Sequence, residues 1–324
     1  MKQLRSAFLL SGALCLLTAS SSLGGGTNRL MLTTVANFND NNYDDFPALM
    51  QANDGMLYGV TQFGGASNLG AVFRSTLSGS LTTLVSFNGT NGAYPTAPPL
   101  QVADGNFYGT AGGGPDWKTT NNNATGIIYR MDTNGVLTTL FSFNQTNGEA
   151  PGGASGLIVG NDGALYGVAQ QGGPNFTNNG GAGTIFKITT NGNFTLLASF
   201  NGTNGVGPAN IIQASDGNFY GTSESAPDDT NGFGTVFQMT PDGHMNTLVR
   251  FNGTNGAYPL AIMQASDGCL YGTTIYGGAY YAGGLPGSLT SGYGTVFKVT
   301  TNGDFTLLAS FEERSWQWPE VCVG

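Results

Sequence analysis

Short apolar runs recur along the chain at a regular spacing. One type is the seven-residue run Leu81–Phe87, which is rich in β-branched and aromatic residues and recurs at 137–143, 194–200, 245–251 and 305–311. Residues of these kinds favour strands. In the last copy, apolar side chains fall on both faces of the predicted strand, a pattern typical of a sheet that lies between neighbouring sheets.

Three further elements accompany each of these runs. The first is an apolar run before an Asp-Gly pair, the second is a Phe/Leu-Tyr-Gly segment after that pair, and the third reads Gly-Thr-Val-Phe-Lys or similar. An Asp-Gly pair between two apolar runs is a strong hairpin signal, because glycine tolerates the positive φ of a tight turn. The five aspartates of these pairs are Asp54, Asp104, Asp162, Asp216 and Asp267.

Successive Asp-Gly pairs lie 50, 58, 54 and 51 residues apart. A self-similar period of about 50 residues is the signature of a repeat architecture. Four antiparallel strands in each period predict an all-β fold, a β-propeller of about five four-stranded blades with repeats of kelch or WD40 length. A right-handed β-helix is the alternative, but its rungs are shorter and lack paired Asp-Gly hairpins.

The repeats set the expected domain boundaries. We expect one repeat domain at 27–311, with repeats near 46–87, 96–143, 152–200, 208–251 and 259–311. Residues 32–38 are a sixth copy of the fourth strand, and we expect them to pair with the fifth blade and close the propeller. The C-terminal tail, 312–324, departs from the repeat pattern.

Residues 1–26 have the layout of a secretory signal peptide. Lys2 and Arg5 precede an apolar stretch at 7–17, and small residues follow at 18–22. The stretch is too short for a typical membrane span, although an N-terminal anchor is the alternative. We therefore expect a secreted or extracellular protein with no integral membrane span after cleavage.

Charge narrows the range of partners. Without the two cations of the predicted signal, 8 Lys and Arg stand against 19 Asp and Glu, a formal net charge of −11. An acidic surface repels nucleic acid and anionic lipid, so neither is expected as a partner.

The combined motifs resemble a known family. The stretches Asp-Gly-Asn-Phe-Tyr-Gly-Thr, Gly-Thr-Val-Phe-Lys, Phe-Thr-Leu-Leu-Ala-Ser-Phe and Asn-Gly-Thr-Asn-Gly-Ala-Tyr-Pro are similar to those of the Gloeo/Verruco (GloVer) tandem repeat. The resemblance covers roughly Leu32 to Phe311. It implies an exported bacterial protein, and it transfers no catalytic residues.

Carboxylates are the first candidates for chemistry. The five repeated aspartates recur in every blade, as expected of turn residues that cap their own backbone. Carboxylates that are not repeated suit catalysis better, and Glu224, Asp228 and Asp229 are the candidates for a propeller glycoside hydrolase or lyase. Their spacing is typical of no metal site, and we expect neither a metal nor a cofactor.

A second set of residues suggests ligand binding. First strands carry glutamine three positions before the aspartate, except in the third repeat, where Val159 stands, and we expect these amides to line a central channel. Aromatic side chains from neighbouring loops would form a rim suited to sugar rings. The predicted ligand-binding residues are Gln51, Gln101, Gln213, Gln264, Tyr94, Tyr258, Trp117 and Tyr276.

These residues favour a non-catalytic binding or scaffold module for a glycan or a surface protein. A water-filled structural channel is the alternative for the glutamines, and packing of loops onto blades is the alternative for the aromatic residues.

Overall fold

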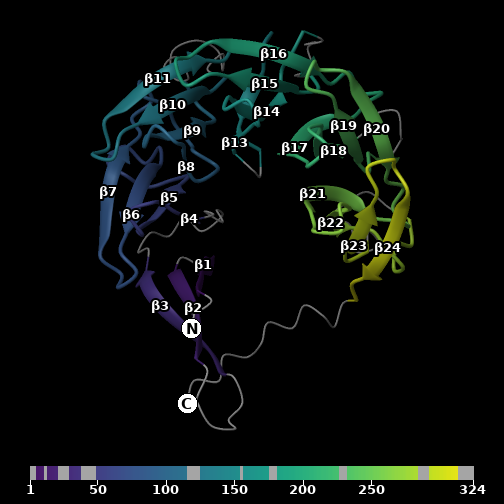
Figure 1. The fold of residues 1–324 in the computed structure, drawn as a ribbon, viewed down its shortest axis with the longest axis horizontal. Coiled ribbons are helices and arrows are strands. Elements are labelled where there is room, and N and C mark those ends of the chain that lie inside the picture. Colours follow the sequence, from purple (N-terminus) through teal and green to yellow (C-terminus); the bar gives the residue numbers. More distant parts are fainter. Residues whose placement is uncertain are drawn as a thin grey trace. The chain divides into compact units, whose positions relative to one another are not determined.

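The computed structural model describes residues 5–10, 13–20, 29–37, 49–114, 125–153, 156–174, 181–225, 232–283 and 292–312. Within these ranges the regular elements are strands, numbered β1 to β24 and labelled in Figure 1 except for β12, and no residue is helical. Accordingly, this part of the chain has no helix that could span a membrane. The chain divides into two compact units, one formed by residues 1–144 and 150–152 and the other by 145–149 and 153–324.

Five sheets follow one another along the chain, each a path of four antiparallel strands. The first two are β4 (Leu49–Gln51), β5 (Leu57–Thr61), β6 (Ala71–Ser75), β7 (Leu81–Ser86), and β8 (Leu100–Gln101), β9 (Phe107–Ala111), β10 (Ile127–Met131), β11 (Leu137–Ser142). The third is β12 (Glu149–Pro151), β14 (Leu165–Gln171), β15 (Thr184–Ile188), β16 (Phe194–Ser199), with β13 (Ile158–Val159) also beside β14. The last two are β17 (Val206–Gln213), β18 (Phe219–Ser225), β19 (Thr235–Met239), β20 (Met245–Arg250), and β21 (Ala257–Gln264), β22 (Leu270–Tyr276), β23 (Thr295–Val299), β24 (Phe305–Ser310).

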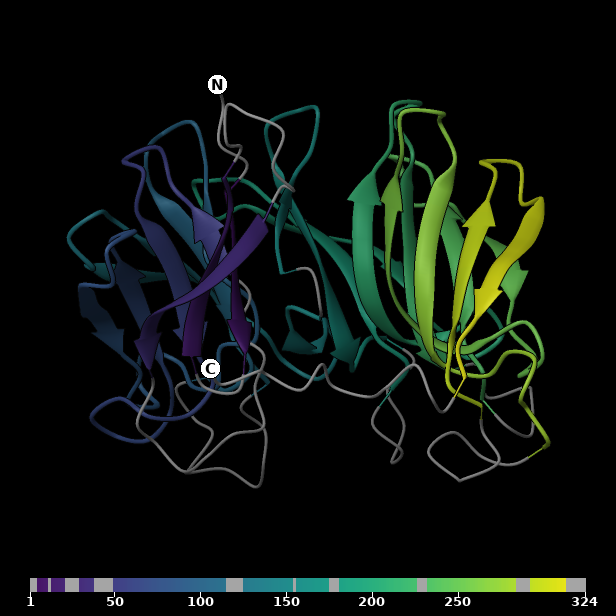
Figure 2. The ribbon, with the colours of Figure 1, turned by 90° about the horizontal axis from the view of Figure 1, so that it is seen from below.

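The predicted all-β fold of five four-stranded blades is therefore confirmed. Neighbouring strands within a blade are joined in chain order, and Figure 2 shows β21 to β24 side by side. The Asp-Gly pairs form the predicted hairpins. In the first repeat, Gly55 has a φ of 78° and donates its N–H to the carbonyl of Ala52.

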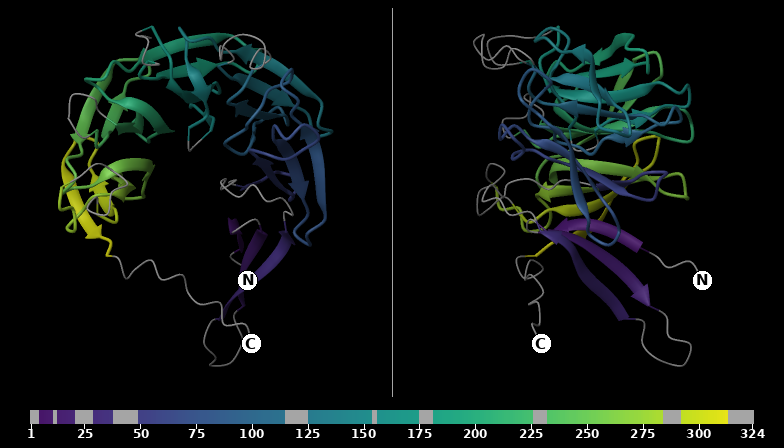
Figure 3. Two further views of the ribbon diagram at one scale, coloured as in Figure 1. Left: turned by 180° about the vertical axis from the view of Figure 1, so that it is seen from behind. Right: turned by 90° about the vertical axis from the view of Figure 1, so that its left-hand side faces the viewer.

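The N-terminal segment forms a sheet of its own. It contains β1 (Arg5–Leu10), β2 (Ala13–Ser20) and β3 (Arg29–Asn37), with β2 in the middle (Figure 3). β3 is thus hydrogen-bonded to β2, which belongs to the predicted signal peptide, and not to a strand of the fifth blade. A strand close by in sequence is the partner with the smallest loop-closure cost. Pairing of 32–38 with the fifth blade after signal cleavage stays a prediction.

The glycine of each Phe/Leu-Tyr-Gly segment lies under an aromatic ring from the next strand. A Cβ on Gly59 would lie 2.5 Å from Cζ of Phe73, and one on Gly167 would lie 2.6 Å from Cζ of Phe186. The other three pairs are Gly109 with Tyr129, Gly221 with Phe237, and Gly272 with Phe297. Each ring follows a register shift between the third and fourth strands. Only glycine leaves room for the ring.

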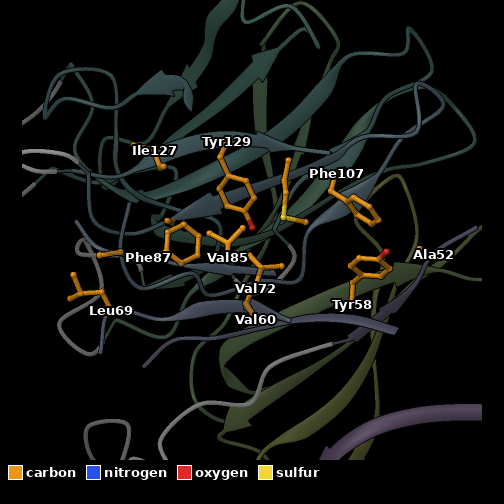
Figure 4. Packing of buried hydrophobic residues seen from close by; sticks show 13 residues of the cluster. Ala52, Tyr58, Val60, Leu69, Val72, Val85, Phe87, Phe107, Ile127 and Tyr129 are labelled. Atoms are coloured by element: carbon orange, nitrogen blue, oxygen red, sulfur yellow. The ribbon is translucent and has the colours of Figure 1, made fainter. Parts of the chain in front are cut away.

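Aromatic side chains also join one blade to the next. In the first unit, Tyr58 stacks on Phe107 of the following blade, with ring centroids 4.3 Å apart, and Phe87 lies 5.7 Å from Tyr129 (Figure 4). The second unit repeats both contacts, as in Tyr166 with Phe219 at 4.5 Å and Phe200 with Phe237 at 5.3 Å. Because each contact joins adjacent repeats, stability is shared between neighbours along the chain.

Tyr129 differs from its counterparts in the other blades, which are phenylalanines. Its side chain is fully buried, and within the described residues its hydroxyl has no hydrogen-bond partner. A buried polar atom without a partner costs about 1–3 kcal/mol. We therefore expect Tyr129→Phe to raise the free energy of unfolding by about 1 kcal/mol.

Denaturant unfolding of Tyr129→Phe would measure this gain. Tyr220→Phe is the matched control, because the hydroxyl of Tyr220 donates to Asp216 at 2.7 Å, and this substitution should lower the free energy of unfolding. Equal losses in both variants would contradict the interpretation of Tyr129.

Candidate functional site

The repeated aspartates serve as turn residues, as predicted. Oδ1 of Asp216 accepts the backbone N–H of Asn218 at 3.0 Å, and its Oδ2 accepts the hydroxyl of Tyr220. The corresponding pair of bonds recurs at Asp54, Asp104, Asp162 and Asp267. The tyrosine partner was not predicted from the sequence, although every repeat has tyrosine four residues after the aspartate.

Most of these carboxylates have a lowered pKa. Burial acts to raise the pKa of Asp216, but the hydrogen bonds from Tyr220 and Asn218 outweigh it. The hydrogen bond from Tyr271, together with the Cys269 N–H and Lys298, lowers the pKa of Asp267 to about 2. The pKa values of Asp104 and Asp162 are also lowered.

These pKa values predict a loss of stability in acid. A carboxyl whose pKa is lower in the folded state stabilises the fold above its unfolded-state pKa, near 3.8. That contribution is lost as the pH falls through the folded-state pKa. We expect the melting temperature to drop by roughly 5 °C between pH 5 and pH 2. Circular dichroism melts across this range would measure the drop, and the double variant Asp216→Asn/Asp267→Asn should show a smaller one.

The predicted glutamines are engaged in the same turns. Nε2 of each one donates to the carbonyl of the glycine four residues later, at 3.0 Å for Gln51, 3.2 Å for Gln101, 2.8 Å for Gln213 and 3.0 Å for Gln264. Three of the amides also reach the preceding repeat. Oε1 of Gln101 accepts the N–H of Asn53. In the same way, Oε1 of Gln213 accepts the N–H of Asn161, and Oε1 of Gln264 accepts the N–H of Ser215. These bonds give the glutamines a structural role in joining adjacent repeats.

Two of the predicted tyrosines have an unusual backbone conformation. Tyr94 and Tyr258 each have a φ of 56°, in the left-handed region that non-glycine residues seldom adopt. Each follows an Asn-Gly-Thr-Asn-Gly loop and precedes a proline, and each donates its N–H to a carbonyl, that of Leu69 or of Phe233. The rings are half-buried and pack edge-on against Phe63 and Tyr276, respectively.

An aromatic group forms where β21 and β22 meet the loop before β19. Tyr258 contacts Tyr276 with ring centroids 5.9 Å apart, and Phe233 contacts Tyr281 at 5.6 Å. Phe233 is buried, whereas the three tyrosines are partly exposed. We call these four residues the loop aromatic group. The structure thus brings together two residues predicted from the sequence, Tyr258 and Tyr276.

Glu224 lies near the end of β18, and its backbone carbonyl is close to Gly234, which follows Phe233 of this group. It is half-buried, and Nε2 of Gln170 donates to its Oε1 at 3.1 Å. Burial raises the pKa of Glu224, and the bond from Gln170 opposes that shift. Gln170 was not predicted from the sequence, although it occupies the same position in the third repeat that Glu224 occupies in the fourth.

Three predicted site residues, Trp117, Asp228 and Asp229, lie outside the described residues. Among the residues that are described, no three of His, Cys, Asp and Glu come together as a group that could hold a metal ion.

The sequence profile of the Gloeobacter/Verrucomicrobia repeat matches residues 21–181 and 118–321. The chain belongs to this repeat family. The family is bacterial, and its two overlapping matches fit the tandem repeats seen in the five blades. No curated protein sequence is significantly similar to this member of the family.

Solved structures share the fold of this Gloeobacter/Verrucomicrobia repeat protein. A luciferin-regenerating enzyme aligns with a TM-score of 0.51 at 13% identity, over 93% of this chain and 91% of its own. A puromycin hydrolase aligns with a TM-score of 0.52 at 13% identity, over 93% of this chain but only 44% of its own. Identity this low shows the β-propeller fold class alone.

Proposed function

We propose that this repeat protein is an exported, non-catalytic binding module whose ligand is a neutral glycan, either free or on a surface protein. The observation that carries the proposal is a difference between the polar side chains that repeat in the blades and those that do not. The repeated Asp, Tyr and Gln residues bond within and between the blades in the same way, whereas the pair of Gln170 and Glu224 and the loop aromatic group do not recur in every repeat.

Aromatic rings beside polar acceptors suit a carbohydrate. A sugar ring presents an apolar face that stacks on aromatic side chains, while its hydroxyls need acceptors. The acidic charge of the chain disfavours anionic ligands, including nucleic acid. Export through the signal at 1–26 would bring the module to extracellular glycans.

Titration of the full chain with neutral oligosaccharides, followed by tryptophan fluorescence, tests this function. We expect saturable binding, and Trp117→Ala would show whether Trp117 reports it. If no neutral oligosaccharide in a broad panel binds, the proposed function is wrong.

A glycoside hydrolase or lyase is the second candidate, because Glu224 is a half-buried carboxyl with a raised pKa. Hydrolases of this kind need two carboxyl groups. Glu224 would supply one, and the other sequence candidates, Asp228 and Asp229, lie outside the described residues. Turnover of a polysaccharide that is abolished by Glu224→Gln would establish this candidate in place of the binding module.

A further inference from the structure

Glu224 occupies a position that every repeat contains, four residues after the tyrosine of the second strand. The five residues at this position are Gln62, Gly112, Gln170, Glu224 and Ile275. The fourth repeat alone carries a carboxylate here. Since the surrounding strands repeat, this residue distinguishes the fourth blade from the others.

A second repeated position lies across from it, directly before the proline that follows each Asn-Gly-Thr-Asn-Gly type of loop. Its residues are Tyr94, Ala150, Gly207 and Tyr258. All four have nearly the same backbone, with φ values of 56°, 52°, 64° and 56°. Each also donates its N–H to a carbonyl from the loop before the third strand of the preceding blade. The backbone at this position therefore accepts glycine, alanine or tyrosine.

Strand pairing shows which residue lies opposite each residue at this second position. Pairing of Val206 with Ser225 and of Pro208 with Ser223 places Gly207 across from Glu224. The same pairing in the fifth blade places Tyr258 across from Ile275. In the second blade, the Tyr94 carbonyl accepts the N–H of Gly112. Tyrosine thus stands opposite an apolar residue or glycine, and glycine stands opposite the carboxylate.

Gly207 leaves the carboxylate uncovered on this side. A Cβ added to Gly207 would lie 3.8 Å from both Cβ and Oε2 of Glu224, an ordinary contact distance. A tyrosine would therefore fit onto this backbone, which Tyr94 and Tyr258 share, and its Cβ alone would already touch the carboxylate. Glycine at this position places no side chain against Oε2.

The open pair offers two acceptors and a donor. Oε1 of Glu224 is taken by Gln170 Nε2, and among the described residues Oε2 accepts no hydrogen bond. The amide oxygen of Gln170 is a second acceptor, and the second amide hydrogen is a donor. Two adjacent hydroxyls of a sugar can donate to the two acceptors. The loop aromatic group is close by, because a Cβ on Gly234, next to Phe233, would lie 2.9 Å from the Glu224 carbonyl.

We propose that Gln170 and Glu224, left open by Gly207, bind adjacent hydroxyl groups of a neutral saccharide, with Gly207 as the residue that determines access. This inference rests on the proposed glycan-binding function and assigns a site to it. Half-burial supports it, since a hydroxyl that replaces water at a partly desolvated carboxylate makes a strong, charge-assisted hydrogen bond.

Calorimetric titration of the full chain tests this site. The probes are neutral hexasaccharides of glucose, xylose and mannose, and tetralysine serves as a cationic alternative. For the best neutral probe, we expect Gly207→Tyr to weaken binding at least tenfold and Gly207→Ala to weaken it less. Glu224→Gln should weaken binding roughly five- to tenfold, because a charge-assisted bond becomes a neutral one.

Asp304→Asn is the matched control for charge, since Asp304 lies in an exposed turn and should leave binding unchanged. The tyrosines at 94 and 258 show that Gly207→Tyr is compatible with this backbone, and thermal unfolding would verify that the variant folds. If Gly207→Tyr and Glu224→Gln bind the saccharide as tightly as the wild type does, the proposed site is wrong but the proposed function stands. Absence of binding to every neutral probe would overturn both. Tighter binding of tetralysine than of any saccharide would show a cation site and overturn the proposal.

Discussion

Gly221→Ala is expected to destabilise the protein by about 3 kcal/mol or more, because the packed sheet has no space for the added methyl group. It would overlap the ring of Phe237 on β19 and the backbone carbonyl of Asn210 on β17. A ring can move to another rotamer, but the carbonyl of Asn210 lies where β17 pairs with β18 and cannot shift without disturbing that pairing. The midpoint of denaturant unfolding would measure the loss.

Gly217→Ala provides the control for this substitution. Gly217 lies in the tight turn with a φ of 83°, and a Cβ there would meet no atom within 4 Å. Only backbone strain opposes it, at a cost of about 1–2 kcal/mol. Adding Phe237→Leu to Gly221→Ala should restore part of the lost stability. A Gly221→Ala variant as stable as the wild type would show that the ring does not require glycine beneath it.

Phe251→Ala should cost about 3–5 kcal/mol, as expected for a large aromatic residue in a closed core. Phe251 is fully buried at the end of the fourth blade, with its ring 5.2 Å from Phe297 and 6.1 Å from Phe305 of the fifth. Its removal takes away part of the core between these two blades.

Leu308→Ala is a suitable comparison for Phe251→Ala, because Leu308 is 49% exposed on β24. Its loss should change the free energy of unfolding by no more than about 0.5 kcal/mol. Thermal unfolding of both variants would separate the two effects. Equal stability of Phe251→Ala and Leu308→Ala would contradict the role assigned to the interblade rings.

Much of the fold could be predicted from the sequence because the motif of each strand and turn occurs five times along the chain. Asp-Gly pairs, Phe/Leu-Tyr-Gly segments and the apolar runs that end in phenylalanine are local signals that mark turns and strands directly. The partners across strands could not be predicted in the same way. Nothing local to Gly221 reveals that the ring of Phe237 lies over it, because this contact depends on the register between two strands.

The candidate site was harder to predict for a related reason. Glutamine three residues before four of the five aspartates is a conspicuous pattern, and its regularity suggested a ring of ligand-binding amides. The structure gives these amides bonds to turns in their own and neighbouring repeats. Gln170 and Glu224, by contrast, are 54 residues apart, and no local sequence signal indicates that their side chains are in contact.

The contacts that join each blade to the next have a consequence for how such a gene changes over time. Tyr166 on Phe219 and Phe200 on Phe237 are both formed by residues at fixed positions in consecutive repeats. Unequal recombination between two repeats in the same phase therefore yields a protein in which the new junction has the same rings as the old ones. Exchange out of phase would pair unlike positions, so we expect the repeat length near each aromatic contact to vary less than the length of the loops between the second and third strands.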